Sequence, residues 1–289
     1  MPERITRTDG ITQTYHTKRK HKPAKSPLIL PDLLDSNIPM PDEYGRYHGQ
    51  ADVTWNETEL LKIVRYKKPK GVERAISRYV DKLPESFLIY LKTKGLSYTI
   101  PEIKTLLYGE HVVGHTAGEK AMIDNLISVS QKIINISRAE PAKISENLSN
   151  DLFTSITPTL DITFKSMRAG HNKKYGPRVS LGTGLEYVAH PRKGIREIFD
   201  NGISKIENIE NVILRSATWA AFATYHQFYL DGNKRNSRNT MNTILLSHGY
   251  DSILIPESSH NQYTDVCVES FTTADLTSQI SFFLNLYQD

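Results

Sequence analysis

Two apolar helical segments separated by a short polar loop constrain the fold more than any other feature of this sequence. In "IENVILRSATWAAFATYHQF", small or apolar residues recur at steps of three and four: Ile209, Val212, Ile213, Ser216, Ala220 and Ala223. In the second segment, which includes "NTMNTILLSHGY", the same spacing links Arg238, Met241, Leu245 and His248, and Gly249 follows as a helix C-terminal stop. The spacing predicts two core helices joined by a tight loop.

Further helical patterns cover much of the remaining chain. They lie in "NETELLKIVRY", "GVERAISRYVDKL", "HTAGEKAMIDNLISVSQKIINI", "SENLSNDLFTSIT" and "ADLTSQISFFLNLYQD". The third pattern opens with Thr116 as N-cap and Glu119 three residues later, which is a capping box. Ser145 is the expected cap of the fourth.

The good strand candidates lie in "RVSLGTGLEYVAHP", where two short extended runs flank Gly182-Thr183-Gly184 and predict a hairpin. The earlier segment "SPLILPDLLDSNIPMPDEYG" is interrupted by prolines, so we expect an irregular connection packed on the body. The sequence therefore predicts a mainly α protein with one small β-hairpin.

Composition narrows the class of protein. With 289 residues, 38% of them hydrophobic and 24% charged, the chain is typical of a soluble globular protein. No run approaches the roughly 18 apolar residues that span a bilayer, and the first residues lack the apolar core of a secretory signal. A lone cysteine, Cys267, excludes an internal disulfide and is expected to be a small buried residue. We expect a cytoplasmic location, with a secreted effector that lacks a signal as the alternative.

The net charge of +4 is concentrated at the N-terminus. Residues 1–30 carry a net charge of +5, whereas the remaining 259 residues carry −1. The basic stretch "HTKRKHKPAK" lacks interleaved aromatic residues, so a solvated, mobile tail is favoured. Nucleic-acid binding is expected only through this tail, if at all.

The loop "HQFYLDGNKRNSR" concentrates groups that suit phosphate chemistry. It feeds a helix N-terminus, where unpaired N–H groups and the helix dipole favour anions, and Gly232 lets the backbone approach closely. Arg235 and Arg238 are three apart, so both guanidiniums can face one phosphate group. Asp231 is a candidate Mg²⁺ ligand and His226 a candidate proton acceptor. Positioning, charge neutralisation and a base are the main needs of phosphoryl or nucleotidyl transfer.

These residues resemble the motif of the Fic/Doc family, written H-x-F-x-[D/E]-G-N-[G/K]-R-x-x-R, which lies between two helices of an all-α core. The matching residues are His226, Phe228, Asp231, Gly232, Asn233, Lys234, Arg235 and Arg238. The run from residue 239 to residue 284 looks like the family's C-terminal part, and "LEYVAHP" looks like its flap. The resemblance covers about residues 101–289 and implies a Fic domain there, preceded by a helical extension over residues 31–100 and the tail.

Fic proteins typically transfer AMP from ATP to a Ser, Thr or Tyr hydroxyl of a target protein, with Mg²⁺. The resemblance implies that His226 is the general base and Asp231 the Mg²⁺ ligand. It implies that the nucleotide phosphates are held by the anion hole and the motif cations, namely Gly232, Asn233, Lys234, Arg235 and Arg238. Phe228 would anchor the loop in the core, and the hairpin near residues 178–190 would pair with the target by strand addition.

The sequence departs from the family pattern in the loop. The family has one residue between the phenylalanine and the acid, whereas this chain has Tyr229 and Leu230. Counting back from the acid would place Gln227 in the histidine position, but Phe222 precedes His226 by the expected helical step. We therefore keep His226 as the base and expect the extra residue to bulge.

Two further departures bear on activity and its control. Lys234 replaces the commoner glycine, and "GNKR" is the spelling of the Doc branch, which is similar to a protein kinase. Many Fic proteins also carry an inhibitory [S/T]-x-x-x-E-[G/N] helix. No glutamate here has that spacing, and the nearest is Glu110, five residues after Thr105. Glu110 is thus the candidate for a displaced inhibitory glutamate, and an ordinary surface glutamate is the alternative.

Three functions follow from these residues. The first is a Mg²⁺-dependent protein adenylyltransferase with ATP as co-substrate. The alternatives are a Doc-like protein phosphotransferase and a degenerate Fic fold that binds partners without catalysis.

Overall fold

Helices dominate the structure, as the sequence predicts. The computed structural model describes residues 39–64, 67–156 and 176–287, and these contain ten α-helices, one short 3-10 helix and three short strands. The basic tail and the segment 157–175 lie outside the described residues, as does most of the proline-interrupted stretch. Residues from Pro39 onward belong to one compact unit, so the described part of the expected N-terminal extension packs into the same core as the helices that follow.

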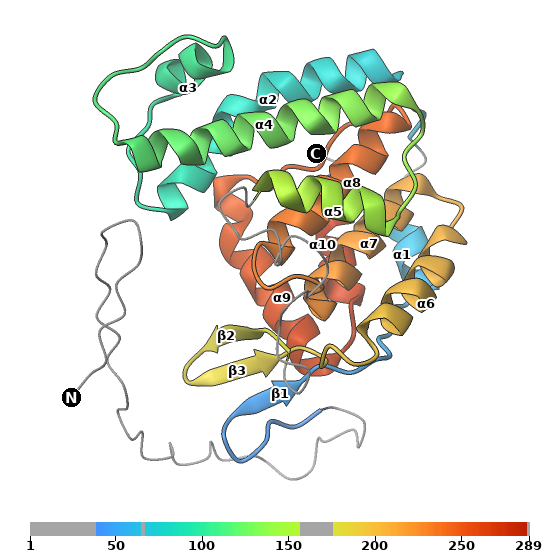
Figure 1. Cartoon of the computed structure of the whole chain (residues 1–289). Helices are drawn as coiled ribbons and strands as arrows, with labels where there is room; N and C mark the ends of the chain where they lie inside the picture. The colour runs from blue at the N-terminus through green and yellow to red at the C-terminus, as the bar shows by residue number, and fades with distance from the viewer. Residues whose placement is uncertain (1–38, 65–66, 157–175, 288–289) are drawn as a thin grey trace, which may run out of the picture. The chain divides into compact units, whose positions relative to one another are not determined.

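The two predicted core helices are α7, Val212–His226, and α8, Asn233–Ser247, and they lie at the centre of the body (Figure 1). Asn211 caps α7, because its side-chain oxygen accepts hydrogen bonds from the first-turn N–H groups of Ile213 and Leu214, both at 3.0 Å. The stop predicted at Gly249 is confirmed. Its φ is +77°, and the N–H groups of Gly249 and Tyr250 bond back to the last turn of α8, as in a Schellman motif.

Three helices pack around one side of α8, namely α2 (Val72–Thr93), α4 (Ala117–Ala139) and α5 (Glu146–Ile156), and α3 (Ile100–Leu107) packs on α2. The capping box of Thr116 and Glu119 is present at the start of α4, and Ser145 accepts a hydrogen bond from the N–H of Leu148 at 3.1 Å. Both caps were predicted from the sequence, and both place their helices where the sequence expects them.

The remaining helices complete the core. They are α1 (Glu57–Ile63), α6 (Ile195–Glu207), α9 (His260–Thr273) and α10 (Thr277–Leu286), with the 3-10 helix Glu257–Ser259 before α9. Cys267 on α9 is buried, as expected, and burial raises the pKa of its thiol. Within the described part of the chain, no helix is both long and apolar enough to cross a bilayer.

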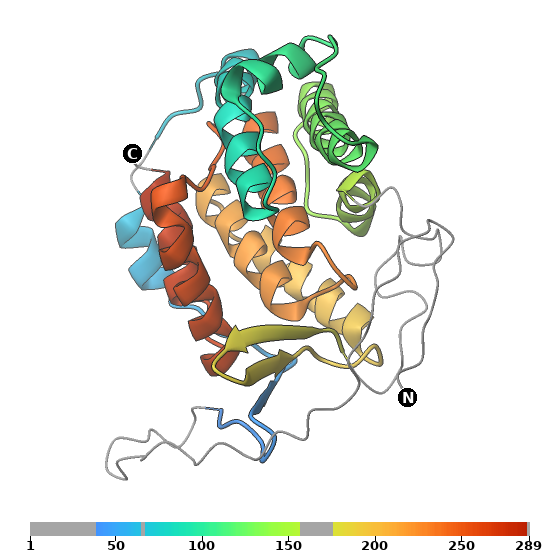
Figure 2. The same cartoon turned by 90° about the vertical axis from the view of Figure 1, so that its left-hand side faces the viewer.

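The predicted hairpin is confirmed, but it belongs to a larger sheet. Strands β2, Arg178–Gly182, and β3, Leu185–Val188, are antiparallel, and the turn between them has positive φ at three successive residues, Gly182, Thr183 and Gly184. A third strand, β1 at Arg46–His48, pairs with β3 in parallel, in the order β1-β3-β2. This strand was not predicted from the sequence. The sheet and the pair α2–α4 lie at opposite ends of the body (Figure 2).

Candidate active site

His226 is the last residue of α7, and it has no exposed surface. Its ring packs among three aromatic rings, with centroid distances of 4.3 Å to Phe222, 5.1 Å to Tyr225 and 5.6 Å to Phe228. A substrate hydroxyl therefore reaches the imidazole only after part of this packing opens. The sequence indicated His226 as a candidate proton acceptor but did not predict this burial.

Phe228, which the resemblance implied as the loop anchor, packs in the core at the start of the loop. The side chain is 1% exposed and contacts Phe199 edge-on at 5.0 Å between ring centroids. Its ring also lies parallel to that of Trp219 at 6.2 Å. These contacts hold the start of the loop directly behind His226.

The loop turns between His226 and α8 through a left-handed residue. Gln227 has φ +50° and ψ +57°, and its side chain donates to the carbonyl of Thr224 at 2.6 Å. Asn233 then fixes the loop from its other end. Its side-chain oxygen accepts the N–H of Tyr229 at 2.8 Å, and its amide donates to the Tyr229 carbonyl at 2.8 Å and to Gln227 Oε1 at 3.0 Å.

Tyr229, one of the two residues between Phe228 and Asp231, turns into the core. It is 2% exposed and stacks on Phe153 at 4.0 Å between centroids. Its hydroxyl donates toward Ser149 Oγ at 2.9 Å and Asn150 Oδ1 at 2.8 Å, and burial raises its pKa far above the ordinary value. Tyr229, one of the two residues that lengthen the loop, thus packs as a buried aromatic side chain.

Asp231 and Gly232 form the entry to α8. Gly232 has φ +72°, a left-handed conformation that favours glycine, and Asp231 accepts its N–H at 2.6 Å through Oδ1. The N–H groups of Asn233 and Lys234, the first two residues of α8, have no intrahelical acceptor. They supply backbone donors at the positive end of the helix dipole, whereas the Asn233 side chain serves the loop.

The three motif cations differ in their surroundings. Arg235 donates through Nη1 to the hydroxyl of Tyr90 at 2.7 Å, and its guanidinium lies 5.1 Å from the centre of that ring. Arg238 lies 5.3 Å from the Tyr263 ring, and the ammonium of Lys234 lies 6.0 Å from the same ring. No ion pair with a carboxylate holds either arginine among the described residues.

Glu110 is exposed and follows α3, where its N–H bonds to the carbonyl of Thr105 at 3.1 Å. It forms no ion pair with Arg238 among the described residues, so an inhibitory contact would require the loop after α3 to move. The residue that contacts a motif arginine is Tyr90 on α2, which the sequence analysis missed. Ser86 and Tyr90 have the spacing sought for the inhibitory serine and glutamate, so a search for any acceptor at that spacing could have found Tyr90.

The sheet is tied to the end of α7. The hydroxyl of Tyr187 on β3 donates to the carbonyl of Tyr225 at 2.8 Å, and the N–H of Gln50, just after β1, donates to the Tyr225 hydroxyl at 3.1 Å. Gly49 passes so close to Tyr187 that a Cβ there would lie 2.5 Å from the hydroxyl oxygen. Since Tyr225 precedes His226, these bonds fix the position of the sheet relative to the candidate base.

The loop between α7 and α8 offers one carboxylate to a metal ion, that of Asp231. Among the described residues, no group of three or more His, Cys, Asp or Glu side chains could hold a metal ion. Asp231 is exposed and has its second oxygen available beside the helix N-terminus. This donor set fits Mg²⁺ bound mainly by phosphate oxygens and water.

Comparison with solved structures identifies the fold. A Fic family protein from Desulfovibrio desulfuricans matches 80% of this chain and 71% of its own, with a TM-score of 0.56 and 16% identity. A Fic domain containing signaling protein from Bacteroides thetaiotaomicron matches 80% of this chain and 91% of its own, at TM-score 0.57 and 17% identity. Fic-1 from C. elegans matches 80% of this chain and 67% of its own, at TM-score 0.56 and 14% identity.

No family profile and no curated protein sequence matches the chain. The structural likeness establishes that the chain has the Fic fold, with its helical core and small sheet, which the sequence resemblance implied.

Proposed function

We propose that this Fic-fold protein is a protein adenylyltransferase that moves AMP from ATP to a hydroxyl of a target protein, with Mg²⁺. The observation that carries the proposal is the start of α8. There, free first-turn N–H groups, a left-handed Gly232 and two arginines without carboxylate partners converge. This arrangement suits a triphosphate, because fixed donors and guanidiniums neutralise its charge without reorganisation.

Each residue has a defined part in this chemistry. The N–H groups at the start of α8 hold the α-phosphate, and Arg235 and Arg238 hold the outer phosphates once Arg235 leaves Tyr90. The target hydroxyl attacks the α-phosphorus, His226 accepts its proton, and pyrophosphate leaves. Because His226 is buried, nucleotide or target binding must open the aromatic packing around it before the proton moves.

Mg²⁺ fits beside Asp231. Its carboxylate oxygen that does not bond Gly232 would take the ion together with phosphate oxygens. The ion would neutralise charge on the phosphates when bound. In its absence, Asp231 itself would repel the triphosphate, so the carboxylate requires a cation for nucleotide binding.

The target strand is proposed to bind the outer edge of β2. The N–H of Glu186 donates to the Gly45 carbonyl, and the Val188 carbonyl accepts the N–H of Gly49, so the segment around β1 already occupies the β3 edge. Because hydrogen bonds alternate along an antiparallel pair, Arg178 and Ser180, opposite Val188 and Glu186, direct their backbone groups away from β3. These groups could pair with an added strand.

Transfer of label decides between the enzymatic alternatives. The full-length protein is incubated with cell lysate and ATP labelled at either the α or the γ phosphate, in the presence of Mg²⁺. Label from the α position supports adenylyl transfer. Label from the γ position alone would overturn it in favour of Doc-like phosphotransfer. The GNKR sequence that contains Lys234 resembles the Doc branch of the family.

A non-catalytic Fic fold is the second candidate, and the full burial of His226 together with the ordered extra residue Tyr229 favours it. Label transfer separates the two, and calorimetry with ATP and Mg²⁺ shows whether nucleotide binding is retained. A non-catalytic module gives no label from either phosphate, and His226→Ala leaves its nucleotide and partner affinities unchanged. In the enzyme, the same substitution abolishes label transfer while ATP binding persists.

A further inference from the structure

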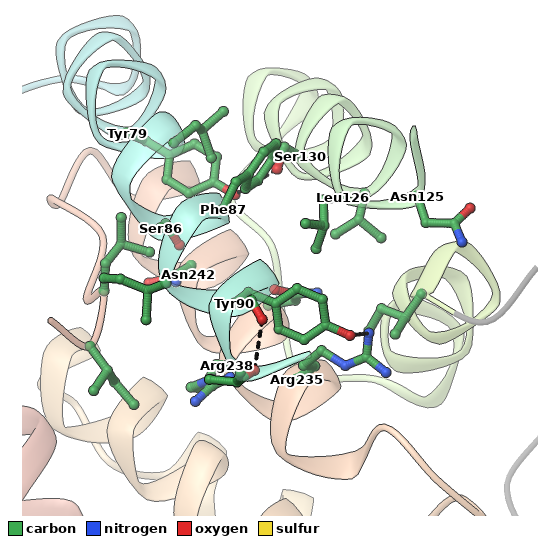
Figure 3. Close-up of a pocket in the computed structure, with 18 of the residues that line it drawn as sticks. Tyr79, Ser86, Phe87, Tyr90, Asn125, Leu126, Ser130, Arg235, Arg238 and Asn242 are labelled. Carbon is green, nitrogen blue, oxygen red and sulfur yellow. Dashed lines mark hydrogen bonds between the residues drawn. The ribbon is translucent and has the colours of Figure 1, made fainter. Parts of the chain in front are cut away.

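A cavity of about 150 Å³ lies between α2, α4 and α8, and its lining includes Arg235 and Arg238. Its apolar wall includes Leu83 on α2. Phe87 on α2, Leu126 on α4 and the aromatic ring of Tyr90 face the hollow in Figure 3. The guanidiniums of Arg235 and Arg238 lie at one end (Figure 3). His226, Asp231, Gly232 and Asn233 are not among its lining residues, so the cavity adjoins the proposed transfer site and shares only Arg235 and Arg238 with its named residues.

The charge of this cavity is positive and uncompensated. Its described lining contains two arginines and His260 but no aspartate or glutamate. Arg235 donates to a neutral phenol, and Arg238 lies over a neutral ring. The Nδ1 of His260 is buried and has no hydrogen-bond partner among the described residues. Guanidiniums near apolar surface favour a phosphate, sulfate or carboxylate, because an anion supplies the acceptors that their N–H groups lack.

The inner part of the cavity is suited to a ring. The side chains of Leu83, Phe87 and Leu126 offer apolar contact, and the buried Tyr79 hydroxyl bonds Ser130 at 3.4 Å. An apolar cavity of about 150 Å³ accommodates one benzene-sized ring. Sites for small molecules commonly combine such an apolar lining with a few polar groups that orient the ligand.

We propose that this cavity binds a small molecule consisting of one aromatic ring and a phosphate, with the ring between α2 and α4 and the phosphate on Arg235 and Arg238. The phosphate replaces the hydroxyl of Tyr90 as acceptor for Arg235. The site does not depend on AMP transfer. It shares its arginines with the outer phosphates of the nucleotide proposed above, so the two ligands compete if that proposal is correct.

Calorimetry with phenyl phosphate, inorganic phosphate and 1-naphthyl phosphate tests the proposal on the full chain. We expect phenyl phosphate to bind at least about tenfold more tightly than inorganic phosphate, because the ring adds apolar contact. Naphthyl phosphate should lose most of this gain, because two fused rings exceed the cavity. Equal affinities for phenyl and inorganic phosphate would overturn the proposal, as would binding of naphthyl phosphate as tight as that of phenyl phosphate.

Variants locate the site. Leu126→Trp fills the cavity and should reduce the phenyl phosphate affinity to that of inorganic phosphate. Leu61→Trp, at an exposed position of α1, should leave both the phenyl phosphate and the inorganic phosphate affinities unchanged. Tyr90→Phe removes the competing acceptor and should tighten phenyl phosphate binding about fivefold. Unchanged binding in both Leu126→Trp and Tyr90→Phe would place the ligand elsewhere and end the proposal.

Saturation with ATP and Mg²⁺ separates this proposal from the proposed function. Weaker phenyl phosphate binding under ATP shows that both ligands use the same arginines. Unchanged phenyl phosphate binding under ATP, with the variant effects intact, contradicts the nucleotide proposal and leaves the cavity site standing.

Discussion

The side chain of Asn233 makes its hydrogen bonds within the loop rather than pointing them toward a ligand. The resemblance implied a place in the anion hole, but its amide makes three hydrogen bonds to Gln227 and Tyr229 and is 5% exposed. Asn233→Ala leaves the buried N–H of Tyr229 without an acceptor. We expect it to lower the free energy of unfolding by about 2–3 kcal/mol, measured by urea denaturation.

Asn239, on the same helix, is the matched control for this loss. Its side chain makes no hydrogen bond among the described residues, so Asn239→Ala should change the unfolding free energy by less than about 0.5 kcal/mol. Equal effects of the two substitutions would mean that the loop is not held by Asn233.

Tyr90 restrains Arg235, and this contact gives a second prediction at the residue scale. Its hydroxyl accepts from the guanidinium at 2.7 Å, so a phosphate must displace it. Tyr90→Phe keeps the ring and should raise self-labelling with α-labelled ATP about fivefold, which corresponds to roughly 1 kcal/mol.

Glu110→Gly is the comparison for Tyr90→Phe. The inhibitory hypothesis for Glu110 predicts a gain of at least about tenfold that Arg238→Ala removes. The structure has no ion pair between these two residues, so we expect Glu110→Gly to change labelling little. A gain from Glu110→Gly alone, with none from Tyr90→Phe, would assign the restraint to Glu110 and contradict the role of Tyr90.

At the scale of the elements, the sheet offers one edge for a partner. The outward N–H of Ser180 on β2 is the group that an added strand would need. Ser180→Pro removes it, and an edge strand accommodates proline there because that N–H does not bond β3. We expect labelling of lysate proteins to fall by about tenfold or more while ATP binding is retained.

Ser180→Ala is the control, because it removes the hydroxyl and keeps the N–H. Its labelling should match that of the unaltered protein. Loss of labelling in both variants, or in neither, would show that the target does not pair with β2 through its backbone.

The elements that the sequence predicted carry their signals locally. The capping box of Thr116, the cap at Ser145 and the glycines of the β2–β3 turn each act within a few residues, so their spacing is sufficient. Strand β1 has three residues, and it is extended because it pairs with β3, about 140 residues later. No local pattern encodes such a partner, which explains why the proline-rich approach to β1 indicated only an irregular connection.

At the scale of the whole molecule, the motif predicted the fold, but it did not predict what surrounds the motif. The anchor role of Phe228 came from the family resemblance, whereas the residue type alone indicated only a buried aromatic side chain. The burial of His226 and the approach of Tyr90 to Arg235 depend on how α2 and the loop pack, and packing between distant segments leaves no fixed spacing in the sequence.

Asp251 joins the two segments that matter most for this packing. It follows α8 and accepts from Lys70, just before α2, at 2.5 Å and from Arg78, within α2, at 2.9 Å. Nearby, the N–H of Lys70 bonds the carbonyl of Gly249 at 2.7 Å. These contacts fasten the start of α2, the helix that carries Tyr90, to the end of α8, the helix that carries the arginines. They make the placement of Tyr90 dependent on a charged junction distant in sequence from the motif.

Acid should therefore weaken this junction. Burial alone would raise the pKa of Asp251, but the hydrogen bonds and positive charges of Lys70 and Arg78 outweigh it and hold the pKa below the ordinary value of 3.8. Because the folded pKa is the lower one, the contribution to stability is complete above the unfolded value and is lost as the pH falls through the folded value. Asp251→Asn should cost about 1 kcal/mol at pH 7, since solvent screens these partly exposed charges.

Urea denaturation of Asp251→Asn and the unaltered protein between pH 7 and pH 2 tests this sign. The two unfolding free energies should differ at pH 7 and converge as the pH falls below 3.8. Glu85→Gln, an exposed change within α2 and outside any ion pair of the described residues, should show no difference at either pH. A difference between Asp251→Asn and the unaltered protein that persists undiminished at pH 2 would mean that the carboxylate stabilises the junction by its shape and hydrogen bonds rather than by its charge.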